Sequence, residues 1–151
     1  MTETVDHPDA FDLDAFLPYQ LAVLSARVSR EFGQIYARRF GISIAEWRVI
    51  AHLAQAGTVS VREIHARVDM DKSKVSRAAA RLEQAGLLTK AASKDDRRLV
   101  ALTLTSEGQA LFAKILPLAR QFETDVLATL DAAQAQRFRH ALERLLERRS
   151  A

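Results

Sequence analysis

Apolar residues recur at intervals of three and four along most of this chain, which is the spacing of helices that bury one stripe. The first such segment begins near Pro18, a residue that suits the first turn of a helix, and Gly41 closes it. The length of this predicted helix exceeds what a small domain needs, which indicates that it packs against a further element. Its apolar seam consists of Leu17, Leu21, Leu24, Val28, Phe32 and Ile35.

Two shorter helices carry start signals of their own. Ser43 with Glu46, and Ser60 with Glu63, have the spacing of a capping box, in which each side chain accepts a hydrogen bond from the backbone of the other residue. The first pair predicts a helix that ends at Gly57. The second pair predicts a short helix from residue 61 to about residue 68.

Residues 71–86, DKSKVSRAAARLEQAG, form the segment around which the rest of the chain is organised. Asp71 can cap the first turn of a helix, and Gly86 can end it in the left-handed conformation. At 100° per residue, Ser73 and Arg77 point away from the apolar side. A short helix, a turn, and a second helix with a cationic outer face are the arrangement of a helix-turn-helix. The predicted buried stripe is Val75, Ala78, Ala79 and Leu82.

After Gly86 the hydrophobic period changes to two, which indicates β-strands. Residues 87–91 and 99–104 are predicted as strands, and the charged residues 93–98, SKDDRR, as the tip between them. A β-hairpin that follows the second helix directly is the wing of a winged helix-turn-helix.

Two further helices are predicted after the hairpin. Thr105 opens a long one, which Pro117 should bend or loosen, and Asp131 with Gln134 opens the last. Their apolar edges, added to that of the first helix, exceed the needs of one small core. We therefore predict a mainly α protein with a small β-hairpin wing: a loose acidic arm (1–15), a dimerisation helix (16–42), a winged helix-turn-helix DNA-binding region (43–104) and dimerisation helices (105–151).

Charge is unevenly distributed along the 151 residues, although the net charge is only +3. Residues 1–26 hold five acidic residues and no Lys or Arg. Residues 62–98 hold ten Lys and Arg against six Asp and Glu, a larger cationic surplus than that of the whole chain. A basic block of this kind is the electrostatic footprint expected for binding a polyanion, although such blocks also serve only to solvate a face.

Other chemistry has little support. The chain has no cysteine, and its four histidines are scattered without a second ligand at a metal-like spacing, so we expect no metal, no cofactor and no enzyme. His65 could touch a DNA phosphate, but a histidine that faces solvent or is satisfied within the protein is the simpler interpretation. No apolar run approaches a membrane span and no export signal begins the chain, so we expect a cytoplasmic protein without membrane contact.

The recognition stretch ending RLEQAGLL, the wing residues Asp96-Arg97-Arg98 and the LTSEG start of the next helix resemble the MarR family of bacterial transcriptional regulators. The resemblance covers about residues 16–148. It implies a homodimeric winged helix-turn-helix protein that binds pseudo-palindromic operator DNA, often a repressor released by a small aromatic ligand or by oxidation. Since the chain has no cysteine, any signal should be a small aromatic or phenolic ligand rather than a peroxide.

The resemblance implies that Ser73, Lys74, Ser76 and Arg77 enter the major groove, that Arg98 enters the minor groove, and that Asp96 holds the wing arginine. The full set of predicted contacts to double-stranded DNA is Arg62, Lys72, Ser73, Lys74, Ser76, Arg77, Arg81, Lys94, Asp96, Arg97 and Arg98.

Ligands in such proteins sit between the dimerisation helices and the winged region, where the first two helices offer Phe32, Tyr36, Trp47 and Arg48. An aromatic body with one nearby cation would hold an aromatic carboxylate. Trp47 could equally be an ordinary core residue, and Arg48 could face water or pair with an acid. An alternative function therefore stays open: a winged-helix module that binds DNA, or another protein, without any effector ligand.

Overall fold

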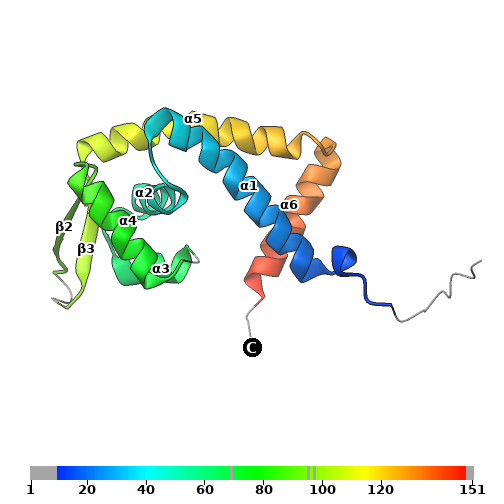
Figure 1. The fold of residues 1–151 in the computed structure, drawn as a ribbon, viewed down its shortest axis with the longest axis horizontal. Coiled ribbons are helices and arrows are strands. Elements are labelled where there is room, and N and C mark those ends of the chain that lie inside the picture. The colour runs from blue at the N-terminus through cyan, green and yellow to red at the C-terminus, as the bar shows by residue number, and fades with distance from the viewer. Residues whose placement is uncertain (1–9, 69, 95, 97, 149–151) are drawn as a thin grey trace, which may run out of the picture.

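The computed structural model describes residues 10–68, 70–94, 96 and 98–148. Along the chain, helices form both ends and the three short strands come between helices; in space, β2 and β3 lie at one edge of the molecule (Figure 1). The elements in order are η1 (Leu13–Ala15), α1 (Leu17–Phe40), α2 (Ile44–Ala56), β1 (Val59–Ser60), α3 (Val61–Arg67), α4 (Lys72–Gln84), β2 (Leu88–Ala92), β3 (Val100–Leu104), α5 (Ser106–Leu127) and α6 (Ala132–Glu147).

The long helix α5 connects two differently built regions (Figure 1). The sheet and helices α2, α3 and α4 gather at the end where α5 begins, and α6 turns back from the end where it finishes. α1 crosses from α5 towards α6. The predicted architecture, a mainly helical protein with a small wing, is confirmed. No helix in the described ranges is long and apolar enough to cross a membrane.

The sheet contains one strand more than the predicted hairpin. Its order is β1-β3-β2, with every pair antiparallel, and β1 pairs Val59 with Leu102 and Ser60 with Ala101. β1 has only two residues, too few to show an alternating pattern, and for this reason the sequence does not reveal it. Its last residue, Ser60, also caps α3, so the sheet and the start of the helix-turn-helix share one backbone position.

Most of the core lies within the region formed by α2, α3, α4 and the sheet, and buried residues of α1 and α5 complete it. Val49, Ile50, Ile64 and Leu102 are completely buried there. The predicted apolar stripe of α4 is confirmed, because all four of its members are at most 1% exposed. Such burial fixes the rotation of α4 about its axis, and therefore fixes which of its residues face outward.

The helix ends agree with the predicted signals, with one exception. The capping boxes of Ser60 with Glu63 and of Asp131 with Gln134 form in both directions. At α2 only half of the predicted box forms: the hydroxyl of Ser43 accepts from the backbone N–H of Glu46 at 3.2 Å. The Glu46 carboxylate turns instead to Arg81 of α4, an opposite charge that is invisible as a neighbour in the sequence.

The structure adds detail to two expectations about flexibility. The predicted loose arm contains the 3₁₀ turn η1, capped by the Asp12 side chain, which accepts from the backbone N–H of Asp14 at 3.0 Å; residues 1–9 lie outside the described part. α5 continues through Pro117 as one helix. Pro117 and Ala113 are both exposed, so the carbonyl that loses its helical partner faces solvent and the helix tolerates the loss.

Candidate functional site

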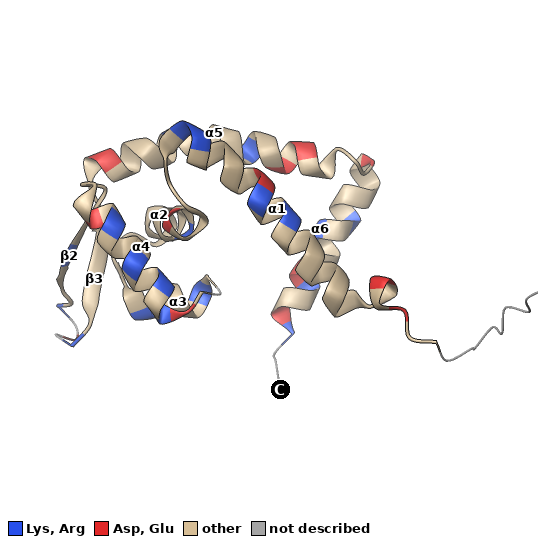
Figure 2. Cartoon of the chain, viewed as in Figure 1, with Lys and Arg blue, Asp and Glu red and all other residues tan. Residues whose placement is uncertain are grey.

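The outer face of α4 carries the predicted major-groove residues. Ser73, Lys74, Ser76 and Arg77 are all exposed, because the apolar stripe opposite them is buried. The carboxylate of Asp71 accepts from the backbone N–H of Lys74 at 2.8 Å and so defines where the helix begins. Figure 2 shows Lys and Arg spaced along α4. The face therefore combines small hydroxyl groups with long cations on a rigid support.

Arg81, near the other end of α4, differs from these residues. Its Nε donates to Oε1 of Glu46 at 2.8 Å, and the Glu46 side chain is only 12% exposed. An arginine held in this way clamps α4 against α2. Its predicted DNA contact stays a prediction, and the ion pair gives the side chain a second role.

Further cations lie around α4. Three of them are exposed: Arg62 on α3, Lys72 at the start of α4 and Lys94, two residues after the end of β2. Figure 2 shows Lys and Arg on α3 and on the wing as well as on α4. This placement suits contacts to a polyanion over a wide surface.

The wing tip holds its arginine through one carboxylate oxygen. Oδ1 of Asp96 accepts from the backbone N–H of Arg98 at 3.0 Å and from Nε of the same residue at 3.2 Å. The Arg98 side chain nevertheless remains 91% exposed. The predicted pairing of Asp96 with an arginine therefore exists in the structure, with Arg98 as the partner. Arg97 lies outside the described residues.

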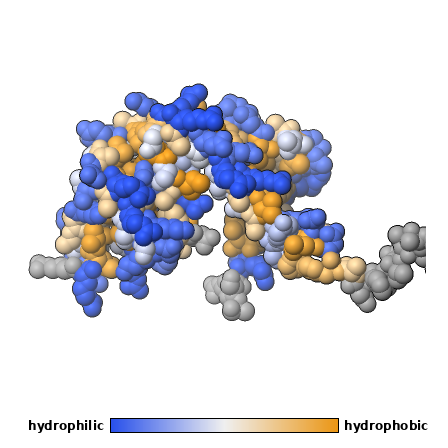
Figure 3. Space-filling view, in the orientation of Figure 1, coloured by the Kyte–Doolittle hydropathy of each residue, from blue (hydrophilic) through white to orange (hydrophobic). Residues whose placement is uncertain are grey.

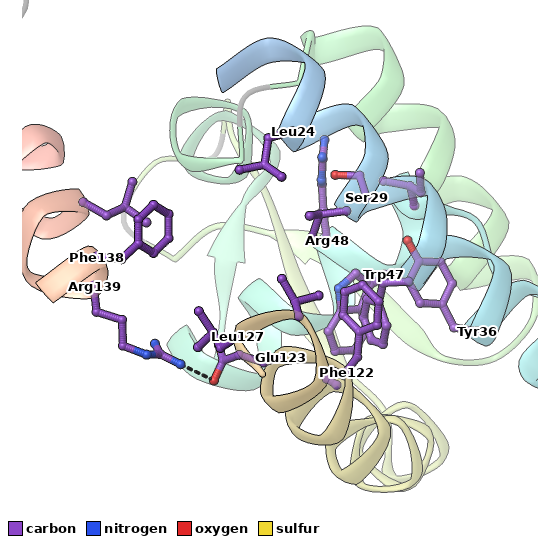
Figure 4. A pocket seen from close by; sticks show the side chains of 16 residues that line it. Leu24, Ser29, Tyr36, Trp47, Arg48, Phe122, Glu123, Leu127, Phe138 and Arg139 are labelled. Atoms are coloured by element: carbon purple, nitrogen blue, oxygen red, sulfur yellow. Dashed lines mark ion pairs between the residues drawn. The ribbon is translucent and has the colours of Figure 1, made fainter. Parts of the chain in front are cut away.

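A cavity of about 460 Å³ opens between α1, α2, α5 and α6 (Figure 4). All four predicted ligand residues line it, and three of them form an aromatic cluster. The ring of Phe32 lies 4.9 Å from that of Tyr36, 5.5 Å from that of Trp47 and 5.1 Å from that of Phe122, measured between centroids. The volume is in the range of small-molecule sites.

The polar groups of this cavity have distinct characters. Burial raises the pKa of Tyr36 to about 12, and the nearby positive charge of Arg48 opposes that rise. The phenol thus stays neutral near pH 7 and can donate a hydrogen bond. On the other wall, Arg139 pairs with Glu123 at 2.8 Å (Figure 4). A neutral donor and the cation of Arg48 suit an acid with an aromatic body.

Comparison with known proteins identifies the fold and the family. Residues 40–99 match the sequence model of the MarR family. An HTH-type transcriptional repressor of Mycobacterium tuberculosis is 29% identical over 87% of this chain and 94% of its own length. A MarR/EmrR family transcriptional regulator from an Acinetobacter species, with 27% identity, has a TM-score of 0.79 over 89% of this chain and 95% of that one.

The chain belongs to the MarR family. It is accordingly a DNA-binding transcriptional regulator of the helix-turn-helix type and not an enzyme. BpsR of Bordetella bronchiseptica, whose DNA binding is regulated by 6-hydroxynicotinic acid, has the same fold, with a TM-score of 0.81 over 93% of this chain and 99% of that one at 22% identity.

The sequence does not reveal every residue that lines this cavity. Phe122 and Glu123 from α5, and Phe138 and Arg139 from α6, line it as well. Helical spacing places Phe122 and Phe138 on the apolar edges of their own helices, but only the arrangement of α1, α5 and α6 shows that these edges border a cavity. The apolar periodicity predicts Phe122 and Phe138 as members of helical seams. It does not predict the ion pair between Glu123 and Arg139.

Two histidines of this MarR-family chain occupy unusual positions. His52 on α2 is buried, its Nε2 has no hydrogen-bond partner among the described residues, and burial followed by the charge of Arg67 lowers its pKa. His65 on α3 is exposed, with Nδ1 at 2.5 Å from the carbonyl oxygen of Met70. No group of three or more potential metal ligands occurs in the described part of the chain.

Proposed function

We propose that this MarR-family regulator is a sequence-specific repressor, which binds a pseudo-palindromic operator as a homodimer and leaves it when a small aromatic acid binds. The observation that carries the proposal is the exposed, cationic outer face of α4 on a helix whose rotation is fixed by its buried stripe. A regulator of this kind works where the DNA is, which supports a cytoplasmic location.

Within the operator, we assign base contacts to α4 and phosphate contacts to its surroundings. Arg77, at the centre of the outer face, suits a guanine edge in the major groove, and the hydroxyl groups of Ser73 and Ser76 suit either bases or phosphates. Arg98 suits the narrow minor groove of A·T-rich DNA, because Asp96 already directs its guanidinium. The remaining phosphate contacts of the proposal are Arg62, Lys72, Lys74, Arg81, Lys94 and Arg97.

The homodimer rests on the apolar surface of the terminal helices. In α6 none of the described residues is buried, although Phe138 and Leu142 are large and apolar. Leu21 and Leu24 on α1 are exposed as well. Figure 3 shows hydrophobic residues on the visible surface near the start of α1. A second copy would cover these faces, and its two-fold symmetry would match a palindromic operator. On this proposal, residues 16–42 and 105–151 are the dimerisation helices that flank the DNA-binding region 43–104.

The proposed effector is an aromatic carboxylate. The cavity offers stacked rings for its body, the neutral phenol of Tyr36 as a donor and the cation of Arg48 for its charge. Regulation of BpsR by 6-hydroxynicotinic acid supports this chemical class. Because α2 carries Arg48 at the cavity and Glu46 at the ion pair with Arg81, a ligand that shifts α2 would also shift α4.

A titration with two defined acids tests the effector. We expect benzoate or 6-hydroxynicotinate to weaken binding of a selected operator, and Arg48→Gln to abolish this response while leaving operator affinity nearly unchanged. Arg39→Gln, an exposed arginine on α1 outside the cavity, is the matched control and should respond like the wild type. Selective DNA binding that neither acid alters, with no heat of binding in calorimetry, would favour a winged-helix regulator without an aromatic-acid effector.

A further inference from the structure

The ring of His65 has one occupied and one free nitrogen. Nδ1 lies 2.5 Å from the carbonyl oxygen of Met70, and because a carbonyl can only accept, Nδ1 must carry the hydrogen. The free ring atom is therefore Nε2, which makes no hydrogen bond within the described part of the chain. Nε2 is thus the ring atom that can contact another group while the bond of Nδ1 to Met70 stays in place.

The position of His65 on α3 directs it away from the core. Ile64 is completely buried, and Glu63 and Arg67 lie on the flank whose charges act on His52 of α2. At 100° per residue, Arg62 and His65 share the opposite flank. His65 is exposed there, and its bond to Met70 ties it to the turn that leads into α4.

The surroundings of this flank favour a phosphate. In a helix-turn-helix, the helix before the recognition helix crosses the DNA backbone. Met70 directly precedes Asp71, the N-cap of α4, so the ring of His65 is tethered beside the start of the recognition helix. The charged groups on this flank are Arg62 one turn earlier on α3, and Asp71 and Lys72 at the start of α4. Glu63 and Arg67, each two residues from His65, lie on the other flank of α3, and Asp69 lies outside the described residues.

Imidazole is the side chain whose charge ordinarily changes between pH 5 and 8. We propose that His65 is a DNA-contact residue, whose imidazolium donates from Nε2 to one backbone phosphate, so that DNA affinity rises as the pH falls from 8 to 6. The neutral ring presents only a lone pair at Nε2, which a phosphate repels. The proposal rests on DNA binding through α3 and α4, and it adds a proton as a regulator of that binding.

The salt dependence of DNA binding at two pH values measures this contact directly. One added phosphate contact steepens the slope of log affinity against log salt by about 0.9 and, near 0.15 M salt, tightens binding about fivefold for each protomer on the DNA. We expect both changes in the wild type at pH 6 relative to pH 8, on operator and on random duplex alike, because a phosphate contact carries no sequence information.

Two substitutions separate this role from a purely structural one. In His65→Asn the side-chain amide nitrogen takes the position of Nδ1 and keeps a donor for Met70. In His65→Gln the amide nitrogen takes the position of Nε2. Neither variant can become a cation. We expect both to lose the extra slope and the fivefold gain at pH 6, and we expect His65→Asn to equal the wild type at pH 8. His140→Gln, an exposed histidine on α6, should keep the full pH response.

Each contrary result has one meaning. If His65→Asn keeps the pH-dependent slope, or if it weakens DNA binding equally at both pH values, the phosphate contact is refuted; the second result leaves only a structural bond to the turn. A wild type that discriminates its operator from random DNA, but has the same slope at both pH values, refutes the role of His65 alone. A wild type without such discrimination refutes the proposed function itself.

Discussion

The winged region and the terminal helices obey the same helical patterns but differ in what covers their apolar sides. In the winged region, α2, α3, α4 and the sheet bury one another, and Val49, Ile50 and Ile64 have no exposed surface. In α6, Leu145 is 49% exposed and Leu146 76% exposed. The comparison indicates that one region is complete within a single chain and that the other needs a partner.

The outer face of α4 and the cavity differ in the same way, because only the first is completed by a single chain. The outer face of α4 is set by burial inside its own chain, so the proposed DNA contacts exist before dimerisation. The cavity, in contrast, is bordered by Leu24, Phe138 and Leu142, which belong to the uncovered faces. We therefore expect changes in the terminal helices to act on assembly and ligand response together, and changes on α4 to act on DNA alone.

The largest expected effect is the loss of the dimer. Leu142→Glu places a charge on the uncovered face of α6 and should give a monomer in sedimentation or light scattering. Operator affinity should fall about a hundredfold or more, because the two half-sites are no longer bound by one assembly. Gln136→Glu, an exposed position on another face of α6, is the control and should stay dimeric. A dimeric Leu142→Glu protein with full affinity would contradict the contrast between the two regions.

The second effect distinguishes base contacts from phosphate contacts within the winged region. Arg77→Ala should cost about 1–3 kcal/mol on the operator and weaken discrimination at one base pair in each half-site. Arg62→Ala should weaken operator and random duplex equally and lower the salt slope by about one. Both variants should stay dimeric. Equal losses on operator and random DNA for both of them would refute the assignment of Arg77 to a base edge.

A smaller effect is expected from the wing. Asp96 removes part of the rotamer freedom of Arg98, and a free arginine carries about 2 kcal/mol of such freedom. Asp96→Ala should therefore weaken operator binding, even though it removes a negative charge near DNA. Arg98→Ala should weaken it most on operators with A·T-rich flanks. Filter binding on matched A·T-rich and G·C-rich flanks measures both, and tighter binding by Asp96→Ala would show simple charge repulsion instead.

The smallest expected effect concerns the pH dependence of the folding stability of the winged region. Burial, and then the charge of Arg67, lowers the pKa of His52, while Glu63 opposes this shift. Because the folded state disfavours the charged ring, stability should be complete above about pH 6.5, the ordinary value, and should fall as the pH drops below it. Denaturant unfolding at pH 7.5 and pH 5.5 measures the fall, which His52→Gln should reduce. An unchanged fall in that variant would assign the acid sensitivity to other groups.

How much of this could be predicted from the sequence depends on whether the signal is local. The stripe of α4, the caps Ser60 and Asp131 and the residue Gly86, at a φ of 76°, were all predicted because each depends on neighbours within four residues. The pair of Glu46 with Arg81 joins positions 35 residues apart. Phe122 and Arg139 likewise enter the cavity only through helix crossing, which no periodicity encodes.

The central claim is that two copies of this chain read one symmetric site. Selection of bound duplexes from a random library by the intact wild-type chain, followed by the measured mass of the complex, tests it most directly. The account predicts an enriched inverted repeat bound by two chains, with half-sites about one helical turn apart. Enrichment of no sequence, or of a single asymmetric site bound by one chain, would contradict it.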